Sequence, residues 1–410
     1  MTTSGDSDTP APTTSVSRRG LLAAGGAVAA TSVGVAAGYA LAGQPTEPAA
    51  APEADDSLVP FHGPHQAGIA TQPQTHAAFL AFDLRGATDR AAAVRLMKLL
   101  TDDARRLTAA TPVLGDQEPE LARTPARLTF TFGFGPRFFT QLGLTQRQPS
   151  GLTELPAFGI DQLKPQFCDG DLLVQVCADD PLVLAHAVRQ VTKTTRSFAK
   201  PRWVQRGFTQ PRVALHGAEV SRNLMGQLDG TVNPVPATPD FDAVVWAGPQ
   251  TGWFAGGTTL VLRRITMQLD TWDELDTPDK ELTIGRRLAS GAPLTGTAAT
   301  DQADFAAVDA NGLPVIPPFS HMARARPHQQ NDRFLRRPYN YDDSSVESGA
   351  DAGLLFVTYQ ADIAAQYLPV QQRLAEQDLL NAWTVPIGSA VFALPPGCDE
   401  NGYIGEGLLA

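Results

Sequence analysis

The sequence has little cysteine and no concentration of positive charge. Three cysteines occur in 410 residues, and none of them forms a Cys-x-x-Cys pair. So sparse and odd a set argues against a disulfide framework, a zinc site or a thioredoxin-like redox site. Lysine and arginine number 32 against 43 aspartates and glutamates, which gives a formal net charge of -11. Because a nucleic-acid-binding surface needs clustered positive charge, we expect no nucleic acid partner.

The usual signatures of hydrolases and nucleotide-binding enzymes are also missing. The sequence contains no G-x-S-x-G elbow, no H-E-x-x-H zinc motif, no P-loop, and no G-x-G-x-x-G after a predicted strand. Hydrophobic residues make up 43% of the chain, alongside 36 glycines and 33 prolines, which is a globular composition. A chain of this length suits two domains.

The N-terminal segment carries the pattern of an export signal. Arg18 and Arg19 precede an apolar run, rich in alanine and glycine, that extends to about Leu41, and Ala40-Leu41-Ala42 supplies a small-x-small cleavage pattern. This pattern predicts a signal peptide for the twin-arginine translocase over residues 1–42, rather than a membrane anchor. A linker rich in proline, alanine and glutamate follows at 43–57. We therefore expect an exported protein, extracellular or in the cell envelope.

Hydrophobic periodicity gives the same order of elements twice. In each half the predicted order is β-α-β-β-α-β, the ferredoxin-like unit. The first half has strands at 77–84, 127–134, 171–178 and 202–208, with helices at 89–109 and 181–198. The second half has strands at 258–269, 320–326, 354–360 and 390–394, with helices at 279–289 and 362–376. The sequence thus predicts an α+β protein of two ferredoxin-like domains, residues 58–225 and 226–410. A cleft between two such halves is a common place for a ligand.

The histidines differ in their promise as functional residues. His321 begins a predicted strand and is followed by a dense run of arginines, which makes it the most interesting of the histidines. His186 lies in an apolar helix and is interpreted as a hydrogen-bonded core residue, and His216 as structural. His62 and His65 are close enough to chelate a metal, but no third ligand is near, so packing is favoured.

Two further segments contain candidate polar groups. Gly226 and Gly230 bracket Asp229 in an otherwise uncharged loop, and glycine allows the backbone to approach a bulky ligand closely. Arg336 and Arg337 follow His321 by about fifteen residues in sequence. Paired arginines bind anions or line a site that they share with neighbouring groups.

Several of these segments together resemble one family. The matching segments extend from about residue 60 to 400 and include FHGPHQAGIATQPQ (61–74), GDLLVQVCADDP (170–181), NLMGQLDGTVNP (223–234), HMARARP (321–327), LRRPYNY (335–341) and LLFVTYQAD (354–362). The sequence resembles the dye-decolourising (DyP-type) haem peroxidases, in particular the exported branch that includes deferrochelatase/peroxidases. The resemblance implies two ferredoxin-like halves in a dimeric-α/β-barrel-like fold, with haem b between sheet and helices.

The resemblance also implies roles for individual residues. His321 would be the proximal iron ligand, with Asp362 accepting a hydrogen bond from its other ring nitrogen. Asp229 would be the distal acid–base group, in a loop whose Gly230 and Thr231 contact the cofactor. The distal arginine would be Arg336, with Arg337 as the alternative. Which arginine holds the haem propionates stays open among Arg324, Arg326 and Arg337.

The implied activity is reduction of hydrogen peroxide with one-electron oxidation of bulky organic donors, dye-like or phenolic. The alternatives are a deferrochelatase that releases iron from haem, and a haem carrier without turnover. A homo-oligomer is compatible with a fold that offers sheet and helix faces.

Overall fold

The computed structural model describes residues 57–410 except 216–219, 330 and 348. The predicted signal peptide, residues 43–56 of the predicted linker, and His216 therefore lie outside the described residues. Within the described part of the chain, no helix is both long and apolar enough to cross a membrane.

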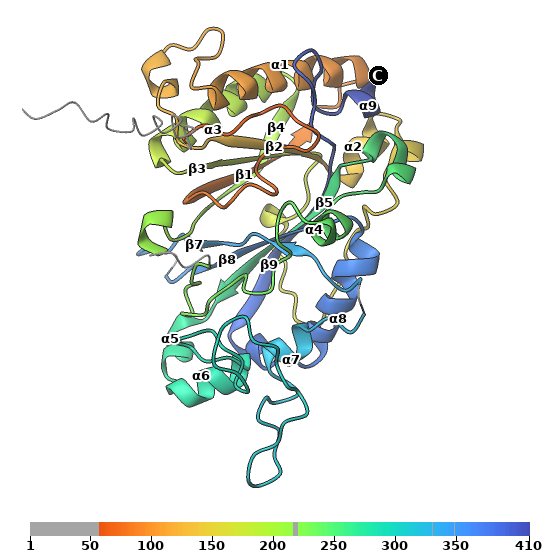
Figure 1. Cartoon of the computed structure of the whole chain (residues 1–410). Coiled ribbons are helices and arrows are strands. Elements are labelled where there is room, and N and C mark those ends of the chain that lie inside the picture. The colour runs from red at the N-terminus through yellow and green to blue at the C-terminus, as the bar shows by residue number, and fades with distance from the viewer. Residues whose placement is uncertain (1–56, 216–219, 330, 348) are drawn as a thin grey trace, which may run out of the picture. The chain divides into compact units, whose positions relative to one another are not determined.

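The first half follows the predicted order of elements. Its strands and long helices are β1 (His76–Leu84), α1 (Arg90–Thr108), β2 (Thr129–Phe134), β3 (Leu172–Ala178), α3 (Pro181–Thr195) and β4 (Ala199–Phe208). The two long helices begin at aspartates, because the carboxylate of Asp89 accepts a hydrogen bond from the Ala92 amide and that of Asp180 from the Leu182 and Val183 amides. Figure 1 shows α1 and α3 side by side over this part of the sheet.

The second half has the same order with one correction. Its main elements are β5 (Thr258–Met267), α6 (Thr277–Ile284), α7 (His321–Ala325), β6 (Leu335–Arg336), β7 (Tyr339–Asp342), β8 (Ala352–Gln360), α8 (Leu368–Gln377) and β9 (Thr384–Leu394). The prediction of a strand at 320–326 is wrong. Ser320 caps the short helix α7 there, its hydroxyl accepting a hydrogen bond from the Ala323 amide. The missing strand is supplied by β6 and β7, which both pair with β8.

Short helices fill the connections. They are α2 (Pro136–Gln141), α4 (Pro239–Val245), α5 (Leu269–Asp273) and α9 (Glu406–Leu409), and a π-helical turn, Ile363–Tyr367, leads into α8. The helix predicted at 279–289 is shorter than expected, because Gly285 takes a left-handed conformation, φ 88°, and ends α6.

The strands form one sheet that closes on itself. Their order is β5-β9-β2-β3-β1-β4-β7-β8-β6, and an additional pairing of β5 with β8 completes a ring. Within each half the order is that of a ferredoxin-like sheet, β4-β1-β3-β2 and β9-β5-β8-β7. The halves meet through the bridges Phe134↔Ala393 and Phe208↔Asn340. The predicted pair of ferredoxin-like halves in a barrel is therefore confirmed.

Alternation along β6 and β7 separates a dry face from a polar face. Leu335, Tyr339 and Tyr341 belong to the buried apolar cluster inside the ring, together with Tyr359 of β8. Neighbouring strand residues project to opposite faces, so Arg336 points away from that cluster. Arg336 therefore lies on the polar face of β6.

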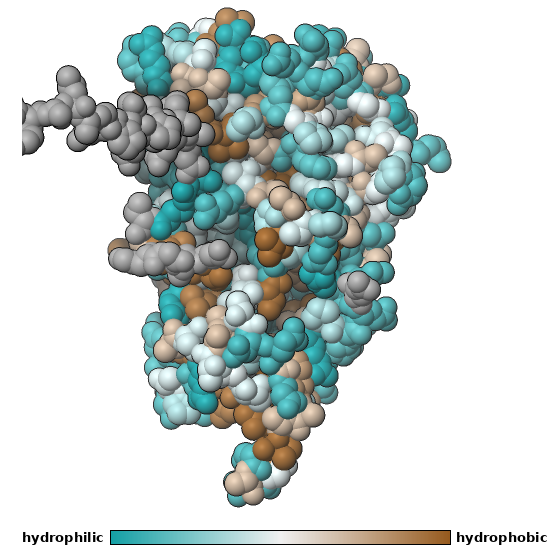
Figure 2. Space-filling view, viewed as in Figure 1, coloured by the Kyte–Doolittle hydropathy of each residue, from teal (hydrophilic) through white to brown (hydrophobic). Residues whose placement is uncertain are grey.

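Figure 2 shows that the surface on the side viewed is mainly hydrophilic, with the loop at 295–319 projecting at the bottom.

Candidate functional site

His321 is held from behind by a carboxylate. Its Nδ1 lies 2.6 Å from Oδ2 of Asp378, whose side chain is only 4% exposed. Burial lowers the pKa of His321, but the charge of Asp378 and this hydrogen bond outweigh burial, so the pKa is raised overall. Nε2 makes no hydrogen bond to any described residue, and the His321 side chain is 33% exposed. The ring therefore presents one free nitrogen with a fixed orientation.

The prediction that Asp362 is the partner of His321 is wrong. Oδ1 of Asp362 instead accepts a hydrogen bond from the Ala365 amide and caps the turn that precedes α8. Asp378 lies at the other end of that helix, and the five residues of the turn plus the ten of α8 span on the order of 20 Å. Because α7 packs against α8, His321 reaches the C-terminal carboxylate and not the N-terminal one.

Asp229 and Arg336 face each other at close range. Nη1 of Arg336 lies 3.1 Å from Oδ1 of Asp229, and the two side chains are 22% and 14% exposed. The guanidinium is not aligned to donate a hydrogen bond, so Oδ1 is buried without a hydrogen-bond partner among the described residues. Leaving a buried carboxylate oxygen unsatisfied costs about 1–3 kcal/mol. A small polar ligand that donates a hydrogen bond there would recover that energy.

The loop around Asp229 has a fixed conformation that requires its glycines. Gly226 and Gly230 have φ values of 80° and 111°, which L residues rarely adopt. The Asp229 amide donates a hydrogen bond to the Ser221 carbonyl, and Arg222 forms a β-bridge with Leu228. The loop geometry thus sets where the carboxylate points. Thr231 follows Gly230 in the same turn and is half-buried.

Arg337 lies elsewhere, contrary to its prediction as a cofactor-binding residue. Its guanidinium donates hydrogen bonds to the Thr71 carbonyl and to the Gln74 side chain, and the residue is 3% exposed. It lies among buried groups that include Tyr339 and Cys177. Since adjacent residues of an extended segment point in opposite directions, only one arginine of the pair can face Asp229, and it is Arg336.

The other arginines proposed for propionates have their own partners. Arg324 donates to the Arg373 carbonyl, and Arg326 packs over the ring of Phe305 at 4.3 Å. The pKa of Arg286 is lowered, chiefly by burial and also by repulsion from the nearby charge of Arg336. Nothing in the sequence pattern pointed to Arg286. Two neighbouring guanidiniums make this region attractive to an anion.

His321, Asp229 and Arg336 belong to one electrostatic environment. The charge of Arg336 lowers the pKa of His321 and that of Asp229 raises it, in addition to the larger effects of burial and Asp378. The structure thus brings together three residues that are widely separated in sequence. Asp378 was missed because an acidic residue after an amphipathic helix gives no sequence signal of its own.

The remaining candidate histidines have structural contacts. His186 lies 2.9 Å from Asp116, and both side chains are 1% exposed, which confirms a hydrogen-bonded core histidine. His65 donates to the Gly256 carbonyl and stacks on Trp246, with ring centroids 3.8 Å apart. Across the described residues, no group of three or more His, Cys, Asp and Glu side chains could hold a metal ion.

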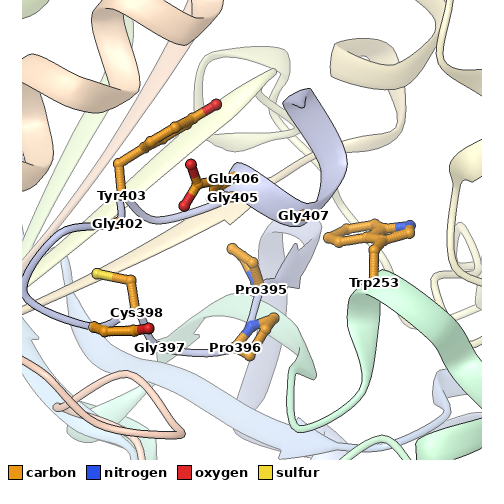
Figure 3. Close-up of a pocket in the computed structure, with 11 residues that line it drawn as sticks. Trp253, Pro395, Pro396, Gly397, Cys398, Gly402, Tyr403, Gly405, Glu406 and Gly407 are labelled. Carbon is orange, nitrogen blue, oxygen red and sulfur yellow. The ribbon is translucent and has the colours of Figure 1, made fainter.

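A surface pocket of about 340 Å³ is formed largely by residues near the C-terminal end of the chain (Figure 3). It is lined by Trp253, Tyr403 and Glu406, among others, and by Cys398, whose thiol has its pKa raised to about 11 by burial and nearby carboxylates. None of the three site residues lines it, and a thiol with this pKa is protonated at neutral pH. We therefore place the functional site at His321, Asp229 and Arg336.

These residues fit a haem group. His321 offers a single free imidazole nitrogen that is backed by a carboxylate, which is how haem proteins orient and strengthen an axial histidine. Asp229 offers, beside a guanidinium, a carboxylate oxygen that accepts no hydrogen bond from the described residues. The fold and the site together define a haem peroxidase.

Comparison with known proteins identifies the family. Models described as Dyp-type peroxidase, N-terminal, and Dyp-type peroxidase, C-terminal, match residues 66–209 and 220–399. A dye-decolorizing peroxidase of Thermobifida fusca (strain YX) is 37% identical over 420 residues, 96% of this chain and 97% of that protein. A deferrochelatase of Yersinia pseudotuberculosis is 36% identical and covers 85% of this chain and 84% of its own length.

Solved structures give the same result. A DyP-type peroxidase from Cellulomonas bogoriensis superimposes with a TM-score of 0.83 at 51% identity, covering 86% of this chain and 98% of that one. Ferric DtpA from Streptomyces lividans superimposes with a TM-score of 0.83 at 39% identity, covering 86% and 97%. The chain belongs to the DyP-type peroxidase family. It is a haem-dependent enzyme that uses hydrogen peroxide and organic electron donors.

Proposed function

We propose that Asp229 is the proton-transfer group of this peroxidase, that Arg336 is its electrostatic partner, and that His321 is the iron ligand. The observation that carries the proposal is the buried Asp229 oxygen, which lies 3.1 Å from the Arg336 guanidinium and accepts no hydrogen bond from any residue that the structure describes. A peroxide O–H group is a donor of the kind that this oxygen lacks.

The chemistry divides between the group that binds and the residues that surround it. Haem, when bound, supplies the iron at which hydrogen peroxide is reduced and takes the electrons that the organic donor gives up. Asp229 accepts the peroxide proton at Oδ1 and returns it to the departing oxygen, a transfer worth about 10²–10⁴-fold in rate. Arg336 stabilises the negative charge that develops on the peroxide oxygens while the proton moves.

His321 would hold the iron, and it would act through its partner Asp378. Nδ1–H donates to Asp378, so the imidazole carries partial anionic character and Nε2 becomes a stronger electron donor. The carboxylate also fixes the tautomer and prevents the ring from rotating. An Asp229–Arg336 pair beside this histidine is what peroxide reduction requires, whereas haem carriage or iron release does not need such a pair.

The test is the reaction of the purified ferric protein with peroxide in a stopped-flow spectrophotometer. Asp229→Asn should keep haem and lose about 10²–10⁴-fold in the rate of reaction with peroxide. Asp362→Asn, the same substitution at a carboxylate that only caps a turn, is the matched control and should react like the wild type. A normal rate in Asp229→Asn would refute the assignment.

We further propose that the chain is exported through the twin-arginine translocase and acts outside the cytoplasm. Support comes from Arg18-Arg19, the apolar run after it and the Ala40-Leu41-Ala42 pattern. Replacing both arginines by lysine should retain the protein in the cytoplasm, and N-terminal sequencing of exported protein should begin at Gly43. Export that continues unchanged in the double lysine variant would contradict the route.

A further inference from the structure

The loop that carries Asp229 also holds the main chain of Arg336. Nδ2 of Asn233 donates a hydrogen bond to the Arg336 carbonyl at 2.7 Å, and the Arg336 amide donates to Oδ1 of Asn233 at 3.0 Å. One side-chain amide therefore satisfies both main-chain groups of this arginine.

The position of Arg336 in the sheet explains why those groups are free to be held. In an antiparallel pair, successive residues direct their main-chain groups alternately toward the partner strand and away from it. The Arg337 amide donates to Val357 of β8 at 2.9 Å, so Arg336 directs its own groups to the opposite side. There β6 is the last strand in the sheet order, and the Asn233 amide takes the place of a further strand.

A tight turn connects this clamp to the carboxylate. The main-chain N–H of Asn233 donates a hydrogen bond to the Gly230 carbonyl at 3.0 Å, and Gly230 has φ 111°. A Cβ at Gly230 would lie 3.4 Å from Nδ2 of Asn233. Asp229 and Asn233 thus sit at the two ends of one turn, and they contact Arg336 at its guanidinium and at its main chain respectively.

We propose that Asn233 is a positioning residue for the reaction with peroxide, an inference that rests on the proposed function of Asp229 and Arg336. Arginine has a long, flexible side chain, and the short strand β6 alone does not set its distance from a loop. By tying the Arg336 main chain to the turn that bears Asp229, Asn233 keeps the guanidinium and the carboxylate directed at the same small ligand. A displacement of about 1 Å in such a group costs on the order of 10²-fold in rate.

The chain offers a matched control for this clamp. Gln66 binds the main chain of Phe132 in the same way, donating to its carbonyl at 3.0 Å and accepting from its amide at 2.8 Å. Phe132 lies on β2 in the first half, where it pairs with Val174 of β3. Gln66→Ala therefore removes an equivalent clamp without touching Arg336.

Fluoride is the probe, because it binds ferric haem as a small anion that accepts hydrogen bonds from a neighbouring guanidinium. Fluoride dissociation constants, peroxide reaction rates, haem content and melting temperatures are measured for the holoproteins. Asn233→Ala should weaken fluoride binding and slow the peroxide reaction by about 10- to 100-fold while retaining haem. Asn233→Asp keeps the acceptor for the Arg336 amide but turns a carboxylate oxygen toward the Arg336 carbonyl, so it should also show a loss of both. Gln66→Ala should lower only the melting temperature.

The results distinguish a failure of the positioning role of Asn233 from a failure of the proposed roles of Asp229 and Arg336. Fluoride affinity and peroxide rate that stay at wild-type values in both Asn233 variants would overturn the positioning role, even if stability falls. Should the alanine variant not fold, the aspartate variant decides the question by the same two measurements. If Asp229→Asn and Arg336→Leu also react normally, the proposed function fails; if they are slow and the Asn233 variants are not, only the inference about Asn233 fails.

Discussion

Asp378→Asn would remove one negative charge from behind His321. Oδ1 of Asp378 also accepts a hydrogen bond from the Leu380 amide at 2.9 Å. Asparagine has a single oxygen, so when that oxygen faces Nδ1–H of His321 the variant gives up the cap on Leu380. The 2.6 Å contact with Nδ1 becomes a bond between neutral groups. The imidazole then donates less electron density to a metal at Nε2.

The size of the effect follows from the difference between two kinds of hydrogen bond. A bond to a charged group contributes about 1.5–3 kcal/mol and a neutral one about 0.5–1.5 kcal/mol, a difference of about 1–1.5 kcal/mol. Because the Asp378 side chain is only 4% exposed, solvent screens little of it. About 1.4 kcal/mol corresponds to about 59 mV for a one-electron couple. We therefore expect the ferric/ferrous midpoint potential to rise by about 40–60 mV.

Spectroelectrochemical titration of the haem-loaded protein measures this shift directly. Asp362→Asn is the matched control, since that carboxylate makes the same kind of cap at the far end of α8 and does not contact His321. The control should keep the wild-type potential. An unchanged potential in Asp378→Asn, or an equal shift in both variants, would refute the coupling through His321.

Three other changes test the site and its support. His321→Ala should alter the visible spectrum of the bound haem, and added imidazole should restore it; an unaltered spectrum would exclude His321 as ligand. Gly230→Ala, at φ 111°, should cost about 1–3 kcal/mol of stability, measured by thermal unfolding, and slow the peroxide reaction. Burial raises the pKa of Asp171 above its ordinary value, so ionisation of this carboxylate opposes folding. Stability should fall as pH rises from the ordinary to the raised pKa, and Asp171→Asn should flatten that fall in melting temperatures measured between about pH 3 and 6; parallel curves would contradict it.

The sequence by itself determined the secondary-structure order and with it the fold. The strands that became β1, β3 and β8 are nearly continuous apolar runs, and α1 and α3 carry both an amphipathic period and an aspartate cap. Those signals are local, so they can be read without knowing any contact. The segment at 320–326 failed for the same reason, because a serine cap on a five-residue helix competes with an alternating pattern that suits a strand equally well.

Only the tertiary structure decided which groups meet. Asp362 and Asp378 are both acidic residues flanking one helix, and the packing of α7 on α8 selects the second as the partner of His321. Arg336 and Arg337 are identical in type and adjacent, and the alternation of the strand directs one to Asp229 and the other into the buried interior. Asn233 gave no signal at all, since its partner is a main-chain group more than one hundred residues away. Residue chemistry is written in the sequence, whereas the direction of each side chain depends on contacts between distant segments.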